Sequence, residues 1–285
     1  MNNKKRKRIE ENFFKYLMAL FTYSLIGLLV LIIFEILMKG VPALSWQMIS
    51  EVPKGGFYFG KEGGILNAIV GSLYLALGSS ILSIVISLPV AIFISISLVK
   101  YEKWQHLIRL VLDLLWGVPP IVYGAFMFSI MLALGLKASL LAGIITIALL
   151  ITPVMIRAMD EVIRNIPLGL LESSLSLGAT RFETATIFFK QALPGIATAF
   201  LLGFAKGIGD TAAVLFTVGY TDYIPESIMD PAATLPLSIF FQLSSPIPEV
   251  KARAYAAAVV LTVIILVISI FSRYLSSKVS KNTTL

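Results

Sequence analysis

A lysine and an aspartate interrupt an otherwise apolar stretch of the chain. Lys206 follows Pro194 by twelve residues, which is about 18 Å along a regular helix. A cation at such a depth in a membrane is costly, and it normally faces a bundle interior or a water-filled path. Asp210 follows Lys206 at i+4, the spacing at which side chains meet on one helix face. The pair is therefore a candidate for an anion path, or alternatively for a structural ion pair. Nearby glycines would permit close packing or close approach of a ligand: Gly203, Gly207 and Gly209.

Other charged residues also fall at or within apolar stretches. The guanidinium of Arg157 could bind a tetrahedral oxyanion through two parallel hydrogen bonds. Its alternative role is to snorkel to lipid headgroups or to fix the topology. Glu35 lies near the outer end of its stretch, so we expect it to reach water. Asp113 follows Arg109 at i+4, and we expect these two to form a structural pair.

The residue inventory excludes several kinds of chemistry. The chain has no cysteine and a single histidine, His106, so neither a thiolate site nor a His-rich metal site is expected. No GxxxxGK[ST] phosphate-binding loop is present, so the chain does not supply a nucleotide site. We therefore predict no catalytic residue, no metal ligand and no cofactor in this chain.

The composition indicates an integral membrane protein. Hydrophobic residues make up 58% of the 285 residues and charged residues 14%, against about a quarter charged in average soluble domains. A helix needs about 20 apolar residues to cross a bilayer core. Six stretches of about that length predict an all-α protein with six transmembrane helices: residues 16–38, 65–99, 107–136, 139–156, 195–218 and 254–271.

Proline and glycine are expected to shape two of these spans. The second span is longer than a bilayer requires, and Pro89 is a natural point for it to bend. The third is interrupted by Gly117, Pro119 and Pro120, which would free backbone carbonyls or form a hinge. This break is either a pore-lining hinge or a simple kink.

The distribution of basic residues predicts the orientation. With six spans, sixteen Lys and Arg residues lie on the side of the N-terminus and six on the other side. Positive charge is retained on the cytoplasmic side, so both termini are predicted to be cytoplasmic. The basic start is followed by an apolar run too long for a signal peptide, which predicts a retained anchor. The net charge of +7 thus reflects topology, and no nucleic-acid partner is expected.

A long polar connection joins the fourth and fifth spans, where neighbouring helices need only about 2–8 residues. One short helix is predicted after Pro167, with Gly178 as its C-cap. A second is predicted to begin with a capping box of Thr180 and Glu183 and to end at Pro194. Two short helices meeting at a glycine below the membrane could contact a protein, or could lie on lipid as an amphipathic surface.

The same connection resembles the cytoplasmic coupling loop of ABC importer permeases. The matching residues are Glu172, Ser173 and Ser174, then Gly178 and Ala179, then Leu193 and Pro194, with serines where that family usually has alanines. Four other stretches are similar to the phosphate-import permeases, in particular their A-type subunit: residues 63–76, 116–126, 205–219 and 234–240.

The resemblance implies the ABC type I importer permease fold with cytoplasmic coupling helices. Its parts would be a basic cytoplasmic tail (1–15), a first transmembrane helix (16–38), an extracytoplasmic loop (39–64), a permease core (65–275) containing the coupling loop (160–194), and a cytoplasmic tail (276–285). Phosphate permeases carry arginines linked to transport at the positions of Arg157 and Lys206, and a glutamate at Asp210. The resemblance thus implies that these three residues lie on the substrate path, and that residues 172–174, 178 and 179 contact an ATPase.

The implied function is ATP-driven import of inorganic phosphate across the cytoplasmic (inner) membrane, with this chain forming half of the pore. The implied partners are a second homologous permease, two ATPase subunits that hold ATP and Mg, an extracytoplasmic phosphate-binding protein, and membrane lipid. A permease for sulfate, molybdate or tungstate is the alternative within the same class. Other classes are a secondary transporter, for which inverted repeats are expected, and a non-transporting scaffold or sensor.

Overall fold

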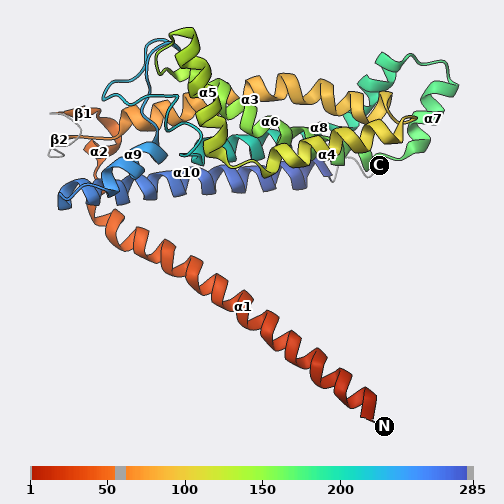
Figure 1. The fold of residues 1–285 in the computed structure, drawn as a ribbon, viewed down its shortest axis with the longest axis horizontal. Coiled ribbons are helices and arrows are strands. Elements are labelled where there is room, and N and C mark those ends of the chain that lie inside the picture. The colour runs from red at the N-terminus through yellow and green to blue at the C-terminus, as the bar shows by residue number, and fades with distance from the viewer. Residues whose placement is uncertain (1, 55–61, 281–285) are drawn as a thin grey trace.

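The computed structural model describes residues 2–54 and 62–280, and long helices run side by side through most of this part (Figure 1). Helices α3, α4, α6, α8 and α10 form an elongated bundle, whereas α1 leaves one end of it at an angle. The helices in chain order are α1 (Asn2–Gly40), α2 (Trp46–Ser50), α3 (Leu66–Ile92), α4 (Glu102–Gly117), α5 (Pro120–Leu134), α6 (Leu140–Arg164), α7 (Leu168–Ser176), α8 (Arg181–Gly209), α9 (Leu235–Leu243) and α10 (Pro248–Ser280).

Short elements complete the described part. A 3₁₀ turn (Val41–Ala43) follows α1, and a π-helical segment (Phe93–Ser97) extends α3. Strands β1 (Pro53–Lys54) and β2 (Glu62–Gly63) pair antiparallel, with Pro53 opposite Gly63. Residues 55–61 of the predicted extracytoplasmic loop and 281–285 of the predicted C-terminal tail lie outside the described residues.

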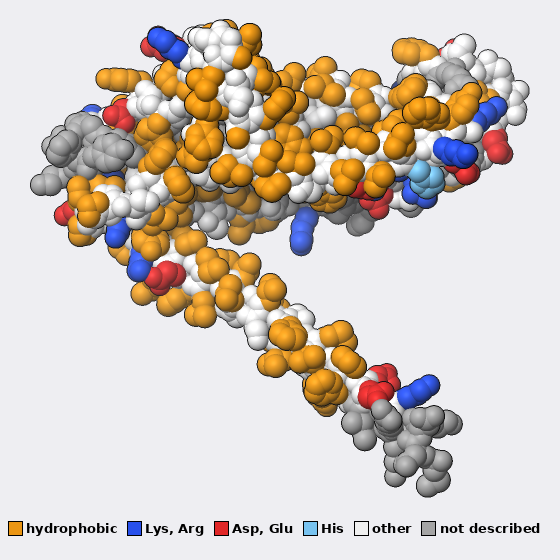
Figure 2. Space-filling view, viewed as in Figure 1, with side chains coloured by type: hydrophobic (Ala, Val, Ile, Leu, Met, Phe, Trp, Pro, Cys, Tyr) orange, Lys and Arg blue, Asp and Glu red, His pale blue; other side chains and the backbone are white. Residues whose placement is uncertain are grey.

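Five helices of the described part are long and apolar enough to cross a membrane, and α4 with α5 could form a sixth, broken span. The five cover Glu10–Ala43, Leu66–Ser97, Leu140–Arg164, Phe182–Gly209 and Pro248–Tyr274. The predicted all-α architecture is confirmed, with six spans if the bent pair counts as one. Hydrophobic side chains cover α1 and most of the length of the bundle (Figure 2).

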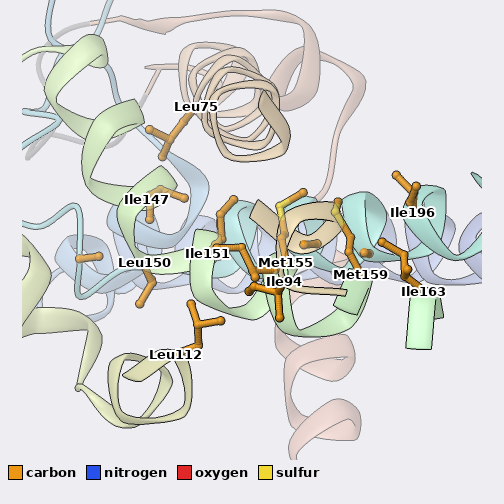
Figure 3. Packing of buried hydrophobic residues seen from close by; sticks show 14 of the residues in the cluster. Leu75, Ile94, Leu112, Ile147, Leu150, Ile151, Met155, Met159, Ile163 and Ile196 are labelled. Carbon is orange, nitrogen blue, oxygen red and sulfur yellow. The ribbon is translucent and has the colours of Figure 1, made fainter. Parts of the chain in front are cut away.

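Helix α6 lies at the centre of the bundle and carries much of the core. Its buried face includes Ile147, Ile151, Met155 and Met159. These side chains pack with Leu75 and Ile94 from the α3 side, Leu112 of α4 and Ile196 of α8 (Figure 3).

Small residues let the helices approach closely. A Cβ on Gly203 of α8 would lie 2.7 Å from the Met155 sulfur, and one on Gly78 of α3 would lie 2.6 Å from Ile144. Such contacts are typical of helix packing in membranes.

The predicted end of the second coupling helix at Pro194 is wrong. Helix α8 runs through Pro194 without interruption from Arg181 to Gly209. A proline inside a helix costs about 3 kcal/mol, but Ala192, Ile196 and Ala199 around it are buried in the core, and this packing supports the continuous helix. The coupling helix and the fifth span are therefore one element. The span lies within Phe182–Gly209, because residues 210–218 leave the helical path.

In the described part of the chain, helix α1 meets the bundle at its C-terminal end (Figure 1). A Cβ on Gly40 would lie 2.5 Å from the carbonyl oxygen of Tyr255, so α1 and α10 touch closely there. Lys39 lies 5.2 Å from the centre of the Tyr255 ring and forms an ion pair with Glu35. Glu35 is exposed, as is most of α1, and its contact with water stays a prediction. The apolar side chains from Tyr16 to Met38 are largely exposed, so other parts of the described chain bury little of α1.

Candidate substrate path and coupling site

Four charged side chains from α4 and α6 form a network, here called the Arg–Asp network: Arg109, Asp113, Arg157 and Asp160. Arg109 donates from Nε to Asp160 Oδ2 at 2.8 Å and from Nη2 to Oδ1 at 3.0 Å. Arg157 donates from Nε to Asp113 Oδ1 at 2.7 Å and from Nη2 to Oδ2 at 3.4 Å. Its Nη1 also donates to Asp160 Oδ2 at 3.4 Å. Two cations and two anions thus balance one another.

Asp160 is the buried centre of this network. Its side chain is only 2% exposed, and a buried carboxylate requires charged or hydrogen-bonding partners. Besides the two guanidinium groups, it accepts a hydrogen bond of 2.9 Å from the Ser95 hydroxyl, which the π-helical segment presents. Sequence reasoning did not single out Asp160. Its position three residues after Arg157, on the same face of the helix, was the available signal.

The predicted pairing of Asp113 with Arg109 is wrong. Although both lie on one face of α4, Arg109 reaches across to the buried Asp160, which leaves Asp113 to the more exposed Arg157. The reason is that a planar guanidinium gains more from two parallel hydrogen bonds to one carboxylate than from a contact along its own helix. The network therefore joins α4 to α6, which the sequence spacing alone did not indicate.

A third polar side chain ties α4 to the bundle. Gln105 lies one turn before Arg109, on the same face of α4, and its Nε2 donates to the carbonyl oxygen of Ile94 at 2.8 Å. Ile94 belongs to the π-helical segment Phe93–Ser97, where the regular hydrogen-bond pattern of the helix is altered. The face of α4 that carries Gln105, Arg109 and Asp113 is thus a polar stripe that contacts both the end of α3 and α6.

Lys206 and Asp210 lie at the end of α8, and they do not form the ion pair that was one of the two alternatives. Helix α8 ends at Gly209, and Asp210 is its C-cap with an extended backbone. Asp210 Oδ1 instead accepts a hydrogen bond of 2.8 Å from the amide of Ala213. Among the described residues, no carboxylate oxygen lies within 4.0 Å of Lys206 Nζ. Lys206 therefore forms no ion pair within the described part of the chain, although its charge still acts on the nearby Asp210 carboxylate.

The face of α8 that carries Lys206 points away from the bundle core. Leu202 and Gly209, which share that face, are exposed, and Lys206 is half-buried. On the other side, a Cβ on Gly207 would lie 3.1 Å from Ile147 of α6 and 3.4 Å from the Ser79 hydroxyl oxygen of α3. The substrate-path roles of Arg157, Lys206 and Asp210 remain predictions. In the structure Arg157 forms ion pairs with two carboxylates, whereas Lys206 forms none with the described residues.

The predicted break in the third span is present as a sharp corner. Helix α4 ends at Gly117, and α5 begins at Pro120 in a direction bent by 91°. Pro119 precedes α5 with extended backbone, as the following Pro120 favours. Tyr123 spans the corner, since its hydroxyl donates to the carbonyl oxygen of Leu115 at 2.9 Å. The corner is thus braced, and its role as a pore hinge remains a prediction.

The predicted coupling loop forms two helices that meet at Gly178. Helix α7 ends at Ser176 with Leu177 as its C-cap, and Gly178 follows with a φ of +83°, a left-handed conformation that favours glycine. Thr180 and Glu183 form the predicted capping box at the start of α8. The Ser174 and Thr184 hydroxyl oxygens lie 3.3 Å apart and join the two helices, and the Ala179 amide donates to the Ser174 carbonyl at 3.1 Å.

The tip of this loop is apolar and exposed. Leu177 is 88% exposed and Phe182 is 82% exposed, while Glu172 and Ser173 are also exposed on α7. Figure 1 shows α7 at one end of the bundle, beyond the long helices and at the opposite end from α2, α9 and the β strands. In the ranges 2–54 and 62–280, no group of three or more His, Asp or Glu residues could hold a metal ion.

Comparison with known proteins identifies the family. Residues 83–281 match the family described as "Binding-protein-dependent transport system inner membrane component". The phosphate transport system permease protein PstA of Pasteurella multocida is 32% identical over 254 residues, which cover 88% of each chain. The protein of the same name from Mycobacterium leprae is 34% identical and covers 76% of this chain and 72% of its own length.

Two solved structures share the fold at lower identity. A chain of the inward-facing MetNI methionine ABC transporter has a TM-score of 0.62 at 18% identity, covering 75% of this chain and 95% of its own. A chain of a bacterial alginate ABC transporter, in complex with an alginate-bound periplasmic protein, has a TM-score of 0.59 at 16% identity and covers 96% and 98%. This multi-pass membrane chain, with an ABC type I importer permease fold, therefore belongs to the binding-protein-dependent transport system inner membrane components and, among them, to the PstA phosphate transport permeases.

Proposed function

We propose that this chain is the permease subunit of an ATP-driven importer of inorganic phosphate and forms half of its translocation pore. The observation that carries the proposal is the extent of the similarity to the PstA proteins, which covers 88% of both chains in the Pasteurella multocida relative. Two cationic side chains at or within apolar helices, Arg157 and Lys206, suit an anionic substrate. Asp210, at the end of α8, would line the same path.

The energy for transport is proposed to come from partner ATPase subunits that hold ATP and Mg, since this chain contains no phosphate-binding loop. The α7–α8 tip supports this proposal. Leu177 and Phe182 are large, apolar and exposed, and such residues are enriched where one protein binds another. Glu172, Ser173, Ser174, Gly178 and Ala179 would form the surrounding contact surface. Two copies of the ATPase are expected, one below each permease.

A second homologous permease is proposed to complete the pore. The exposed apolar surface of α1, which leaves the bundle, is consistent with cover by membrane lipid and by a neighbouring subunit (Figures 1 and 2). The end of the bundle that carries α7 would face the cytoplasm of the cell, together with both termini. The opposite end, with α2, α9 and the β strands, would receive an extracytoplasmic phosphate-binding protein. The Gly117–Pro120 corner would flex as phosphate passes.

The proposal is tested by removing the gene for this chain, together with any paralogue, and measuring uptake of radiolabelled phosphate. High-affinity uptake should be lost and should return with the wild-type chain. Sulfate and molybdate uptake, measured in the same cells, distinguish the related oxyanion permeases. Unchanged phosphate uptake would reject the assignment. Uptake that follows an ion gradient rather than ATP would indicate a secondary transporter instead.

Replacement of Lys206 with glutamine tests the substrate path. The variant removes a charge that forms no ion pair within 4.0 Å among the described residues, so assembly should be retained. Phosphate transport should fall about tenfold or more, because a charge-assisted hydrogen bond contributes about 1.5–3 kcal/mol. Transport is measured in vesicles containing the assembled importer. Lys206→Arg, which keeps the charge, is the matched control and should stay active; normal transport by Lys206→Gln would remove Lys206 from the path.

A further inference from the structure

The two acids of the Arg–Asp network differ in how firmly they are held. The side chain of Asp160 is 2% exposed and accepts hydrogen bonds from Arg109, Arg157 and Ser95. The side chain of Asp113 is 47% exposed, and among the described residues its hydrogen bonds come from Arg157. Asp160 is therefore a fixed part of the fold, whereas Asp113 has an exposed side toward which it can rotate away from Arg157.

Asp113 also occupies a particular part of the guanidinium. Its two oxygens take the edge formed by Nε and Nη2 of Arg157, at 2.7 and 3.4 Å. Two oxygens of a tetrahedral oxyanion would bind this edge in the same bidentate way. The remaining nitrogen, Nη1, is directed to Asp160 at 3.4 Å. An oxyanion and Asp113 would thus compete for the same edge of Arg157, while Asp160 keeps the guanidinium in place.

We propose that Asp113 is an internal counter-ion that occupies the oxyanion-binding edge of Arg157 and is displaced when phosphate arrives. This inference rests on the proposed function, because it concerns the anion path of a phosphate permease. With Asp113 in place, Arg157 has no free edge that could bind an anion through two hydrogen bonds. The charge of the guanidinium is then paired while no phosphate is bound, although its surroundings are apolar. With Asp113 displaced, Arg157 stays oriented by Asp160 and offers its edge to phosphate.

Helix α4 has the structural freedom that this exchange requires. Gln105 and Arg109 anchor its first turns to the π-helical segment and to Asp160. Asp113 lies further along, one turn before the corner at Gly117, and its departure breaks neither of those contacts. The exchange therefore needs only a change in one half-exposed side chain, and the fold of the bundle is retained.

The test is the binding of inorganic phosphate to the complete importer in lipid nanodiscs, without the binding protein, followed by the broadening of the phosphate ³¹P resonance during a titration. Asp113→Asn should lower the apparent Kd about two- to fivefold, the size expected on removal of a partly exposed ionic competitor. Asp113→Glu should bind as the wild type does. In an Arg157→Lys background, which lacks the bidentate edge, Asp113→Asn should have no effect.

An unchanged or weaker Kd in Asp113→Asn would overturn the inference, as would an equal gain in the Arg157→Lys background. Lower transport with unchanged phosphate binding would assign Asp113 a structural role and would overturn it too. Asp113→Ser is a second charge-removing variant for the case in which Asp113→Asn does not assemble. If the wild-type importer carries no phosphate at all, the proposed function fails; if it does and the Kd does not shift, only this inference fails.

Discussion

Replacing Asp160 with alanine is expected to destabilise the chain by about 3–5 kcal/mol, the usual effect of removing one partner from a buried ion pair. Asp160 is the common acceptor of Arg109 and Arg157 and is almost completely buried. Its loss leaves the largely buried guanidinium of Arg109 without an acceptor and also removes the partner of Ser95. The effect should appear as a lower unfolding temperature and a lower yield of the purified importer.

Glu161→Gln is the matched control. Glu161 is the next residue of α6, but its side chain is exposed and makes no ion pair among the described contacts. Its replacement should change stability by less than about 0.5 kcal/mol, as for most surface positions. Asp160→Asn, which keeps the shape and part of the hydrogen bonding, should fall between the two. If Asp160→Ala unfolds at the wild-type temperature, the Arg–Asp network does not hold α4 to α6.

Replacement of Gly178 with valine is expected to separate ATP hydrolysis from phosphate transport. Gly178 has a φ of +83°, and a β-branched residue held in that conformation carries about 1–3 kcal/mol of strain. Apart from its two neighbours in sequence, no described residue has an atom within 4 Å of the position where its Cβ would be, so the effect comes from the backbone and not from a clash. The strain is relieved when α7 turns relative to α8, which moves Leu177 and Phe182 out of register with the proposed ATPase surface.

The measurement is co-purification of the ATPase subunit together with phosphate-stimulated ATP hydrolysis in the assembled importer. Gly169→Val is the control, because Gly169 lies in α7 with equally open surroundings and without a positive φ angle. It should bind the ATPase and retain stimulation, whereas Gly178→Val should lose one or both. A Gly178→Val importer with normal coupling would show that the left-handed turn is not required.

Features that depend on neighbouring residues in the chain could be predicted from the sequence. The apolar stretches predicted the spans, because the length of an apolar helix is set by the bilayer. The capping box at Thr180 and the glycine at 178 were predicted for similar reasons, since each depends on a local backbone conformation. The break at Pro119 also followed from local sterics.

Features that depend on packing between distant segments could not be predicted in this way. Local rules stop a helix at Pro194, yet α8 continues because residues on either side of it pack into the core. Spacing paired Asp113 with Arg109, whereas the structure pairs each of them with a residue of α6 more than forty positions away. Asp210 accepts a hydrogen bond from the Ala213 amide, in the non-helical segment after α8, and forms no ion pair with Lys206.

The Arg–Asp network also restricts how this chain can diverge over evolutionary time. Arg109, Asp113, Arg157 and Asp160 are joined by shared hydrogen bonds, so a change at one alters what the other three can tolerate. A substitution of Asp160 by an uncharged residue leaves unpaired cations. A later loss of Arg109 would then remove one of these cations and relieve the defect. In descendants of this sequence the four positions should consequently be inherited as a set, with changes in one accompanied by compensating changes in another.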